Sequence, residues 1–236
     1  MSHFLVGVFS HDTEDVDELL APYNEQDESY CELIPASEEA QREAREAYEN
    51  REDPNESFEG FIWSYDSLQE NENGELCYLL NPHAKWDWYD ADGGRWANAN
   101  MYRLKKDERP DEFNRVTVSQ MDFSPDMDKY HQAEAFWDEY VIGGNPSGDK
   151  YPHQFYRPEY YLDRYGTKEK YAEYYADVQR PYAFITPDGT WHETGNMLWF
   201  GMDSTDRKTM DTYAEEWKQA VAQHQDCYLT YVDCHI

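Results

Sequence analysis

The two ends of this chain each carry a short, almost wholly apolar segment that has to be buried. Residues 3–9 read His-Phe-Leu-Val-Gly-Val-Phe, and residues 228–236 read Tyr-Leu-Thr-Tyr-Val-Asp-Cys-His-Ile. Short runs rich in β-branched and aromatic residues are typical of buried strands. We therefore predict a core strand at each end of the chain, and the fold must bring both into its interior.

The sequence between these ends predicts further strands and helices. A β-hairpin is expected at residues 182–193 around Pro187-Asp188-Gly189, because a turn signal there separates two β-rich runs. Apolar residues at helical spacing predict a helix at 204–223. Other patterns predict helices at 12–22, 37–51, 130–140 and 158–177, the last broken at Gly166, and a strand at 76–80.

The order of these elements is β-α, a long insertion, and then β-β-α-β. This order is typical of a ferredoxin-like (split βαβ) antiparallel sheet with helices on one face. We therefore predict an α+β fold made of a single domain, residues 1–236, with a large irregular or helical insertion at roughly 98–178. In that topology the first and last strands are antiparallel neighbours, which would bring His3 close to Asp233 and His235.

Acidic residues outnumber basic ones by 50 to 20, so the formal net charge is −30. Such a field repels nucleic-acid backbones and anionic membranes, and it favours basic partners. We therefore expect no direct binding to nucleic acid or membrane. The acidic surface has two interpretations: it mimics nucleic acid towards a basic host protein, or it only keeps the chain soluble.

Neither a disulfide scaffold nor a familiar catalytic motif is apparent. The four cysteines are scattered and form no Cys-x-x-Cys pair, which predicts reduced thiols and a cytoplasmic protein. There is no secretory signal and no apolar run long enough for a membrane span. Walker, dinucleotide-binding, zincin and nucleophile-elbow motifs are absent, and neither a metal nor a cofactor is expected.

The sharpest local signal is a segment that combines tryptophans, two cations and a glycine pair. Cations flanked by indoles can hold an anion or a flat ring, and glycines permit close approach of the backbone. The alternative is that the tryptophans fill the core and the cations neutralise neighbouring acids. The candidate ligand-binding residues here are Lys85, Trp86, Trp88, Gly93, Gly94, Arg95 and Trp96.

Trp191 and His192 in the predicted hairpin complete the candidate ligand-binding set. If the tryptophan segment folds over the sheet near this hairpin and the C-terminal strand, its cations would face a concave surface. The candidate acid–base residues are His192, His235 and Asp233, although histidines at chain ends are commonly inert.

Several short blocks together resemble a family of uncharacterised phage and bacterial proteins. They are Met1-Ser2-His3-Phe4, Asn81-Pro82-x-x-Lys85-Trp86-Asp87-Trp88-Tyr89, Gly93-Gly94-Arg95-Trp96, Pro187-Asp188-Gly189-x-Trp191-His192, Trp199-Phe200-Gly201-Met202 and Val232-Asp233-Cys234-His235-Ile236. The resemblance implies a phage or mobile-element accessory role, in the cytoplasm of the host cell, but no assigned reaction.

Two classes of function follow. The first is a counter-defence binding protein, which either sequesters an anionic nucleotide-like ligand or blocks a basic host protein by mimicking nucleic acid. The alternative is a small hydrolase acting on a nucleotide-like phosphoester, with a histidine as acid or base and Arg95 on the phosphate. The sequence indicates neither the ligand nor the oligomeric state.

Overall fold

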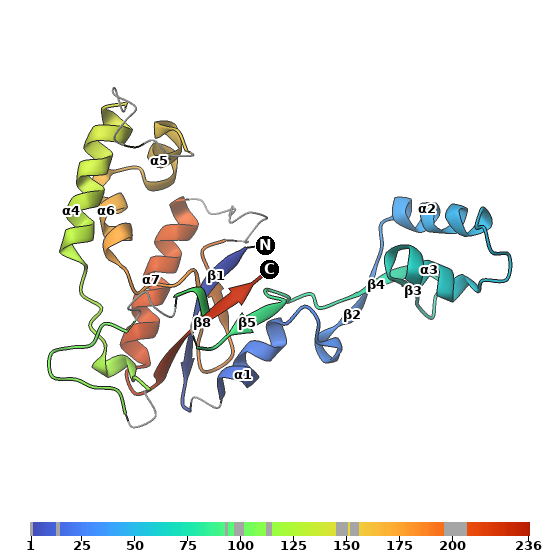
Figure 1. Ribbon diagram of the computed structural model, residues 1–236, viewed down its shortest axis with the longest axis horizontal. Helices are drawn as coiled ribbons and strands as arrows, with labels where there is room; N and C mark the ends of the chain where they lie inside the picture. Colours follow the sequence, from blue (N-terminus) through green and yellow to red (C-terminus); the bar gives the residue numbers. More distant parts are fainter. Residues whose placement is uncertain are drawn as a thin grey trace. The chain divides into compact units, whose positions relative to one another are not determined.

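The chain forms two compact units (Figure 1). The computed structural model describes residues 2–12, 15–92, 94–96, 102–111, 115–144, 151, 156–195 and 207–236. Unit 1 comprises residues 1–19 and 89–235, and unit 2 comprises residues 20–88 with Ile236. A single domain with an insertion at 98–178 was expected. The described part of that segment belongs to unit 1, and the separate unit is residues 20–88.

Unit 1 contains a five-stranded sheet in the order β5-β8-β1-β6-β7. Its strands are β1 (His3–Ser10), β5 (Trp88–Asp90), β6 (Ala183–Ile185), β7 (Trp191–Glu193) and β8 (Tyr228–His235). β1 and β8 pair antiparallel along their full length, from His3 opposite His235 to Ser10 opposite Tyr228. The predicted pairing of the two terminal strands is thus confirmed.

The sheet is mixed and not purely antiparallel, which corrects the ferredoxin-like expectation. β1 runs parallel to β6, with Val6 opposite Ala183 and Val8 opposite Ile185, and β6 then pairs antiparallel with β7. In a ferredoxin-like sheet the second strand of the hairpin would lie beside β1. A parallel pair needs a long crossover, and the helical segment between β1 and β6 supplies one.

Helix α7 (Arg207–Gln223) packs on one face of this sheet. Phe9, Phe184 and Leu229 of the strands form a buried cluster with Tyr213 and Trp217 of the helix. The hydroxyl of Tyr213 donates to the carbonyl of Pro181 at 2.8 Å, so its burial leaves no polar atom unsatisfied. The helical spacing in the sequence correctly indicated this apolar face.

A second core of unit 1 is aromatic and helical. Helix α4 (Met127–Phe136) continues as a π-helical stretch (Trp137–Ile142), and α5 (Pro158–Tyr165) and α6 (Lys168–Ala176) follow. Figure 1 shows α4 and α6 side by side. Gly166, at φ +77°, ends α5, so the predicted break between two tyrosine-rich helices is confirmed.

Unit 2 pairs three antiparallel strands with two helices. The strands lie in the order β2-β4-β3, with β2 at Glu32–Pro35, β3 at Leu68–Glu70 and β4 at Leu76–Leu80. Helices α2 (Glu38–Glu49) and α3 (Phe58–Asp66) contribute Ala44 and Ile62 to its small core. Ser37 and Ser57 cap them by accepting from the N–H groups of Ala40 and Gly60.

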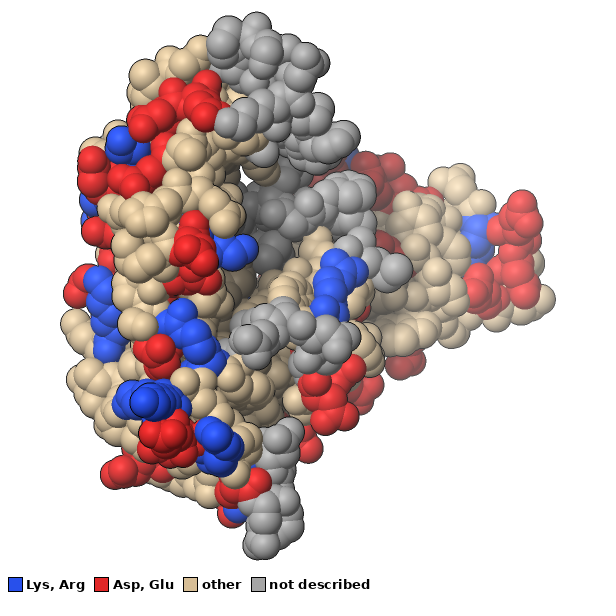
Figure 2. All heavy atoms as spheres, turned by 60° about the vertical axis from the view of Figure 1, so that its left-hand side comes forward, with Lys and Arg blue, Asp and Glu red and all other residues tan. Residues whose placement is uncertain are grey.

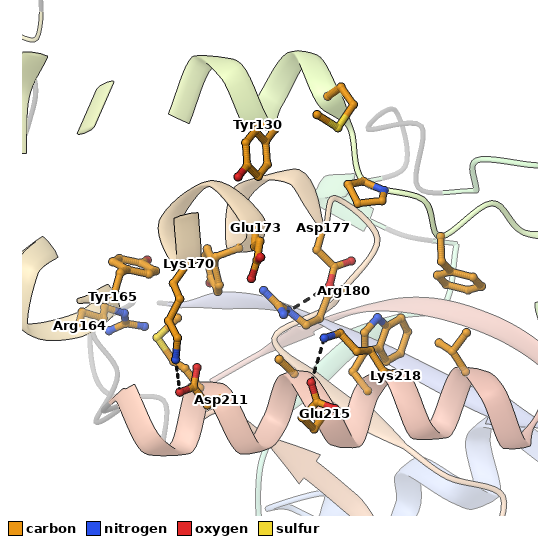
Figure 3. A pocket seen from close by; sticks show the side chains of 18 residues that line it. Tyr130, Arg164, Tyr165, Lys170, Glu173, Asp177, Arg180, Asp211, Glu215 and Lys218 are labelled. Atoms are coloured by element: carbon orange, nitrogen blue, oxygen red, sulfur yellow. Dashed lines mark hydrogen bonds and ion pairs between the residues drawn. The ribbon is translucent and has the colours of Figure 1, made fainter. Parts of the chain in front are cut away.

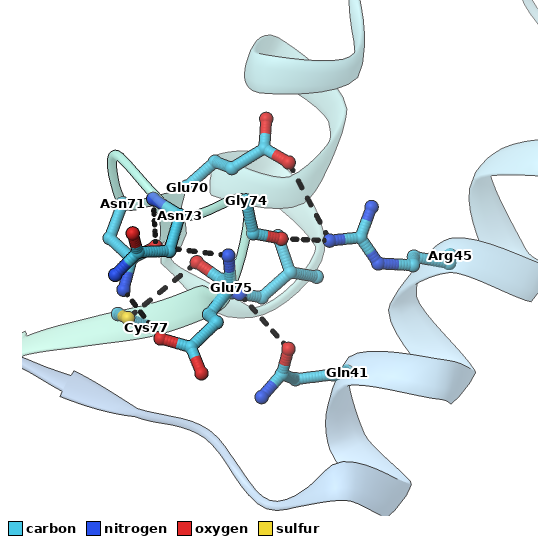
Figure 4. Close-up of polar contacts among 9 residues, drawn as sticks. Gln41, Arg45, Glu70, Asn71, Asn73, Gly74, Glu75 and Cys77 are labelled. Atoms are coloured by element: carbon cyan, nitrogen blue, oxygen red, sulfur yellow. Dashed lines mark hydrogen bonds and ion pairs between the residues drawn. The ribbon is translucent and has the colours of Figure 1, made fainter.

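The turn between β3 and β4 is held by side chains (Figure 4). The amide oxygen of Asn71 accepts from the backbone N–H groups of Asn73 and Glu75, at 2.9 and 3.0 Å. Gly74 supplies the positive φ of +79°. Arg45 on α2 donates to the carbonyl of Gly74 at 2.6 Å, so the turn is tied to the helix.

The remaining elements are short. They are α1 (Asp15–Leu20) and the 3₁₀ turns Ala21–Tyr23, Glu28–Tyr30, Gly94–Trp96 and Val118–Gln120. All four cysteines are free thiols. Within the described residues, no helix combines the length and apolar character required to cross a membrane.

Candidate functional site

Segments from the two chain ends meet at the carboxylate of Asp233 in unit 1. Asp233 lies on β8 and is 1% exposed, and its Oδ1 is 3.0 Å from Nδ1 of His3 on β1. The rings of His3 and His235 are in edge-to-face contact, with centroids 5.1 Å apart. The predicted meeting of His3, Asp233 and His235 is confirmed, because the strand register places all three on the same face of the sheet.

The other carboxylate oxygen of Asp233 holds the 3₁₀ turn Gly94–Trp96. The backbone N–H of Arg95 donates to Oδ2 at 2.8 Å. Gly94 has φ +42°, and a Cβ atom there would lie 2.5 Å from the same oxygen. Gly94 therefore permits the close backbone approach expected of the glycine pair, but the group approached is the protein's own carboxylate. Gly93 lies outside the described residues.

We call Asp233, His3, His235, Gly94 and Arg95 the Asp233 centre. Each oxygen of the carboxylate accepts a hydrogen bond from a described residue, and because an ionised carboxylate can only accept, the bond to His3 places a proton on Nδ1 of that imidazole. The side chain of His3 is 20% exposed and that of Asp233 is 2% exposed. A buried carboxylate thus orients an imidazole that solvent reaches.

Cys234 follows Asp233 but plays a different part. Burial, with a smaller effect of the Asp233 charge, raises the pKa of its thiol far above the usual range. The thiol stays protonated at neutral pH, so it is a core residue and a poor nucleophile.

His192 lies away from the Asp233 centre. It pairs with Phe184, whose neighbour on β1 is Gly7, whereas His235 pairs with His3. The two histidines are therefore three strands and four residues apart, or roughly 19 Å by standard strand spacing and rise. The proposed convergence of His192 with Asp233 and His235 does not occur.

His192 instead lines an open groove of about 600 Å³ between the β6–β7 hairpin and α7. Its Nδ1 is 3.1 Å from Oε2 of Glu216, and its ring stacks on Phe184 with centroids 4.4 Å apart. His11 and His224 also line the groove, and none of the described residues that line it is a lysine or arginine. The imidazole is well oriented, yet the described lining offers an anion no permanently charged partner.

Two of the candidate tryptophans in unit 1 have structural partners. Trp96 packs against the sheet–α7 core. The indole N–H of Trp191 donates to Glu193 at 2.9 Å, and its side chain points to the sheet face opposite His192. The core interpretation therefore holds for Trp96.

Lys85, Trp86 and Trp88 belong to unit 2, whereas Arg95 and His192 belong to unit 1. Trp86 is buried, and its indole N–H donates to the carbonyl of Leu20 at 3.3 Å. Asn81, also buried, donates to the carbonyls of Pro22 and Asn24. This part of the motif holds the loop that starts unit 2, while Trp88 is exposed.

The cations that line a cavity between α4, α6 and α7 were not expected from the sequence. Arg164, Lys170, Arg180 and Lys218 come from four separate segments. No spacing rule links them, because only tertiary packing brings them together. The aromatic richness of residues 158–177 is the nearest signal in the sequence.

Among the described residues, no group of three or more His, Cys, Asp or Glu side chains is placed to hold a metal ion. Residues Trp199–Met202, which contribute to the family resemblance, lie outside the described residues. No protein-family model, no curated protein and no solved structure matches the chain.

Proposed function

We propose that the Asp233 centre performs acid–base chemistry on a nucleotide-like phosphoester, which makes the protein a small hydrolase. The observation that carries this proposal is the buried Asp233 carboxylate 3.0 Å from His3 Nδ1, with the His235 ring in contact with the His3 ring. A carboxylate that orients one imidazole beside a second one supplies both a base and an acid.

In this reaction neutral His3 takes a proton from the attacking water through Nε2. The water oxygen forms a bond to phosphorus, and the P–O bond to the leaving group breaks. Protonated His235 donates its proton to the leaving alkoxide, and the two imidazoles then exchange protons with solvent to restore the starting state. The Asp233 carboxylate stabilises the imidazolium that forms on His3.

Arg95 supports a phosphate-bearing substrate. Its side chain is exposed, while its backbone N–H is fixed to Asp233 at 2.8 Å. A guanidinium can bind two phosphate oxygens and neutralise charge that develops on them. The described residues that line the groove at His192 include no such cation, so we assign phosphoester chemistry to the Asp233 centre.

Destruction of a nucleotide signal would suit the counter-defence role that the resemblance implies. The acidic-mimic alternative requires a continuous acidic face. Figure 2, which brings forward the side of unit 1 that carries α4, shows Lys and Arg side chains interspersed among Asp and Glu. This arrangement favours a site-based function over mimicry on that face.

The test is hydrolysis of bis(p-nitrophenyl) phosphate and of cyclic nucleotides by the purified full chain. We expect a bell-shaped pH–rate profile for the wild type, because one limb needs a neutral imidazole and the other a protonated one. His3→Gln and His235→Gln should each lower kcat by roughly 100-fold or more. Arg95→Ala should mainly raise KM, since its backbone contact is retained.

The matched control is His131→Gln, because His131 is an exposed histidine on α4 outside the centre. It should leave the rate unchanged. Each variant is first checked for an unchanged melting temperature. A wild type that cleaves none of these substrates, or folded His3→Gln and His235→Gln variants with full activity, would contradict the proposal.

A further inference from the structure

A cavity of about 770 Å³ lies between α4, α6 and α7 of unit 1 (Figure 3). Its walls include Tyr130 of α4, Tyr174 of α6 and Trp217 of α7. The volume falls within the range of small-molecule sites, and such sites combine aromatic walls with a few polar groups. We call this cavity the Arg180 pocket.

Cations are concentrated in this pocket. Of the 18 described residues that line it, four are Lys or Arg, namely Arg164, Lys170, Arg180 and Lys218, whereas the whole chain has 20 in 236 residues. Four lining residues are acidic, which matches the density of 50 in 236. The lining is therefore formally neutral within a chain of charge −30, and an anion meets less repulsion there than over the average surface.

Arg180 is the group best placed to receive an anion. Its side chain is only 9% exposed, and its guanidinium lies over the Tyr174 ring at 4.8 Å from the centroid. Its only ion pair within the described part of the chain is to Asp177 at 3.4 Å, which is too long for a good hydrogen bond. An arginine side chain has five N–H donors, and here none donates to a described residue.

Two of the other cations, Lys170 and Lys218, have exposed side chains and form exposed ion pairs. Lys170 reaches from α6 to Asp211 on α7, and Lys218 pairs with Glu215 at 2.9 Å. Figure 3 shows Arg180 and Lys218 pointing into the same space. Exposed ion pairs of this kind contribute at most about 1 kcal/mol to stability, so a lysine can leave its carboxylate and contact a ligand at a small cost in free energy.

We propose that the Arg180 pocket binds a phosphate-bearing, ring-containing molecule of mononucleotide size. The phosphate pairs with Arg180 and is assisted by Lys218, and the ring lies against the tyrosines and Trp217. This site is separate from the Asp233 centre and needs no chemistry there. It gives the protein a means of retaining a nucleotide in addition to hydrolysing a phosphoester.

Isothermal titration with AMP tests the proposal, with adenosine and inorganic phosphate as comparisons. All titrations use the full chain in a His3→Gln background, so that hydrolysis at the Asp233 centre cannot consume ligand. We expect AMP to bind more tightly than phosphate, and adenosine to bind most weakly. Arg180→Gln should weaken AMP binding at least tenfold, because it removes the buried cation.

Arg42→Gln is the matched control, because Arg42 is an exposed, ion-paired arginine on α2 of unit 2. It should leave AMP binding unchanged. Asp177→Asn should tighten AMP binding several-fold by removing the carboxylate that competes for Arg180. The Asp177→Asn variant tests AMP binding by the Arg180 pocket even if Arg180→Gln fails to fold.

Three outcomes would overturn the proposal: no AMP binding to the parent protein, full binding by folded Arg180→Gln, or no gain in Asp177→Asn. None of them depends on catalysis. A failure of the Arg180 pocket and a failure of the hydrolase proposal are therefore distinguishable.

Discussion

Asp233 and Arg180 are two nearly buried charged residues of opposite sign in unit 1, and they differ in their hydrogen-bond partners. The Asp233 carboxylate has a hydrogen-bond donor for each oxygen, at 3.0 Å from His3 and 2.8 Å from the backbone of Arg95. Within the described residues, the Arg180 guanidinium has one ion pair, at 3.4 Å, and an aromatic ring beneath it. The carboxylate has a hydrogen-bond donor on each oxygen, whereas the guanidinium, which lines a cavity, has N–H donors that no described residue accepts from.

The difference indicates what each charge is for. A buried carboxylate with both oxygens satisfied is rigid, so it can position an imidazole and hold a turn. A buried guanidinium with unused donors is costly unless something else satisfies them, which is the condition for ligand binding. Perturbing the Asp233 centre should therefore cost stability, whereas perturbing the Arg180 pocket should cost little.

The largest effect is expected for Gly94→Ala. The new Cβ atom would lie 2.5 Å from Oδ2 and 2.7 Å from Cβ of Asp233, at a φ of +42° that favours glycine. Strain and overpacking should together lower the free energy of unfolding by about 2–4 kcal/mol, measured by urea denaturation.

Gly189→Ala provides the control for Gly94→Ala. Gly189 has φ +83°, and an added Cβ atom would lie more than 4 Å from every described residue that it could meet. Only the backbone strain remains, so the cost should be about 1 kcal/mol. Equal losses of unfolding free energy in the two variants would show that the close contact between Gly94 and Asp233 does not contribute to stability.

Asp233→Asn should have the next largest effect. The amide has one accepting oxygen in place of two, so His3 keeps its bond only by changing tautomer, and both hydrogen bonds lose the strength that the charged carboxylate gives them. We expect a loss of about 1–3 kcal/mol in unfolding free energy. Asp226→Asn, an exposed acid two residues before β8, should be neutral. A neutral Asp233→Asn would mean that the carboxylate does not hold this part of the fold.

Asp177→Asn should change the free energy of unfolding by less, and it should raise it instead of lowering it. Burial raises the pKa of Asp177, and the charge of Arg180 only partly offsets this. The folded state then binds this proton more tightly than the unfolded state does, so stability is lost as pH rises above the ordinary aspartate pKa. At neutral pH the variant should melt a few degrees higher at most.

Melting curves of wild type and Asp177→Asn across acid to neutral pH check this sign. The difference in melting temperature between the two proteins should increase as pH rises. A variant that melts lower at neutral pH would show that the ion pair with Arg180 outweighs the cost of burying the carboxylate.

The smallest effect is expected for Lys170→Gln. Lys170 pairs with Asp211 across α6 and α7, but both side chains are about half exposed. The loss should be under about 1 kcal/mol and should shrink further in high salt. A loss as large as that of Asp233→Asn would mean that the pocket, too, is a rigid part of the fold.

Local sequence patterns predicted much of unit 1. Both terminal strands, the hairpin at β6–β7 and the apolar face of α7 follow from periodicity and turn residues, which act over a few neighbours. Helix α3 was missed. Its sequence, Phe-Glu-Gly-Phe-Ile-Trp-Ser-Tyr-Asp, has no clear polar face and contains a glycine, so the 3.6-residue period is weak.

The candidate site also combines features that the sequence predicted with features that it did not predict. The sequence by itself determined that His3, Asp233 and His235 sit at the ends of two apolar strands, and antiparallel pairing of those strands brings them together. Only the tertiary structure decided that β6 lies parallel to β1, that Gly94 rests on Asp233 and that four cations surround one cavity. These features depend on packing between segments far apart in the chain, which local propensity does not encode.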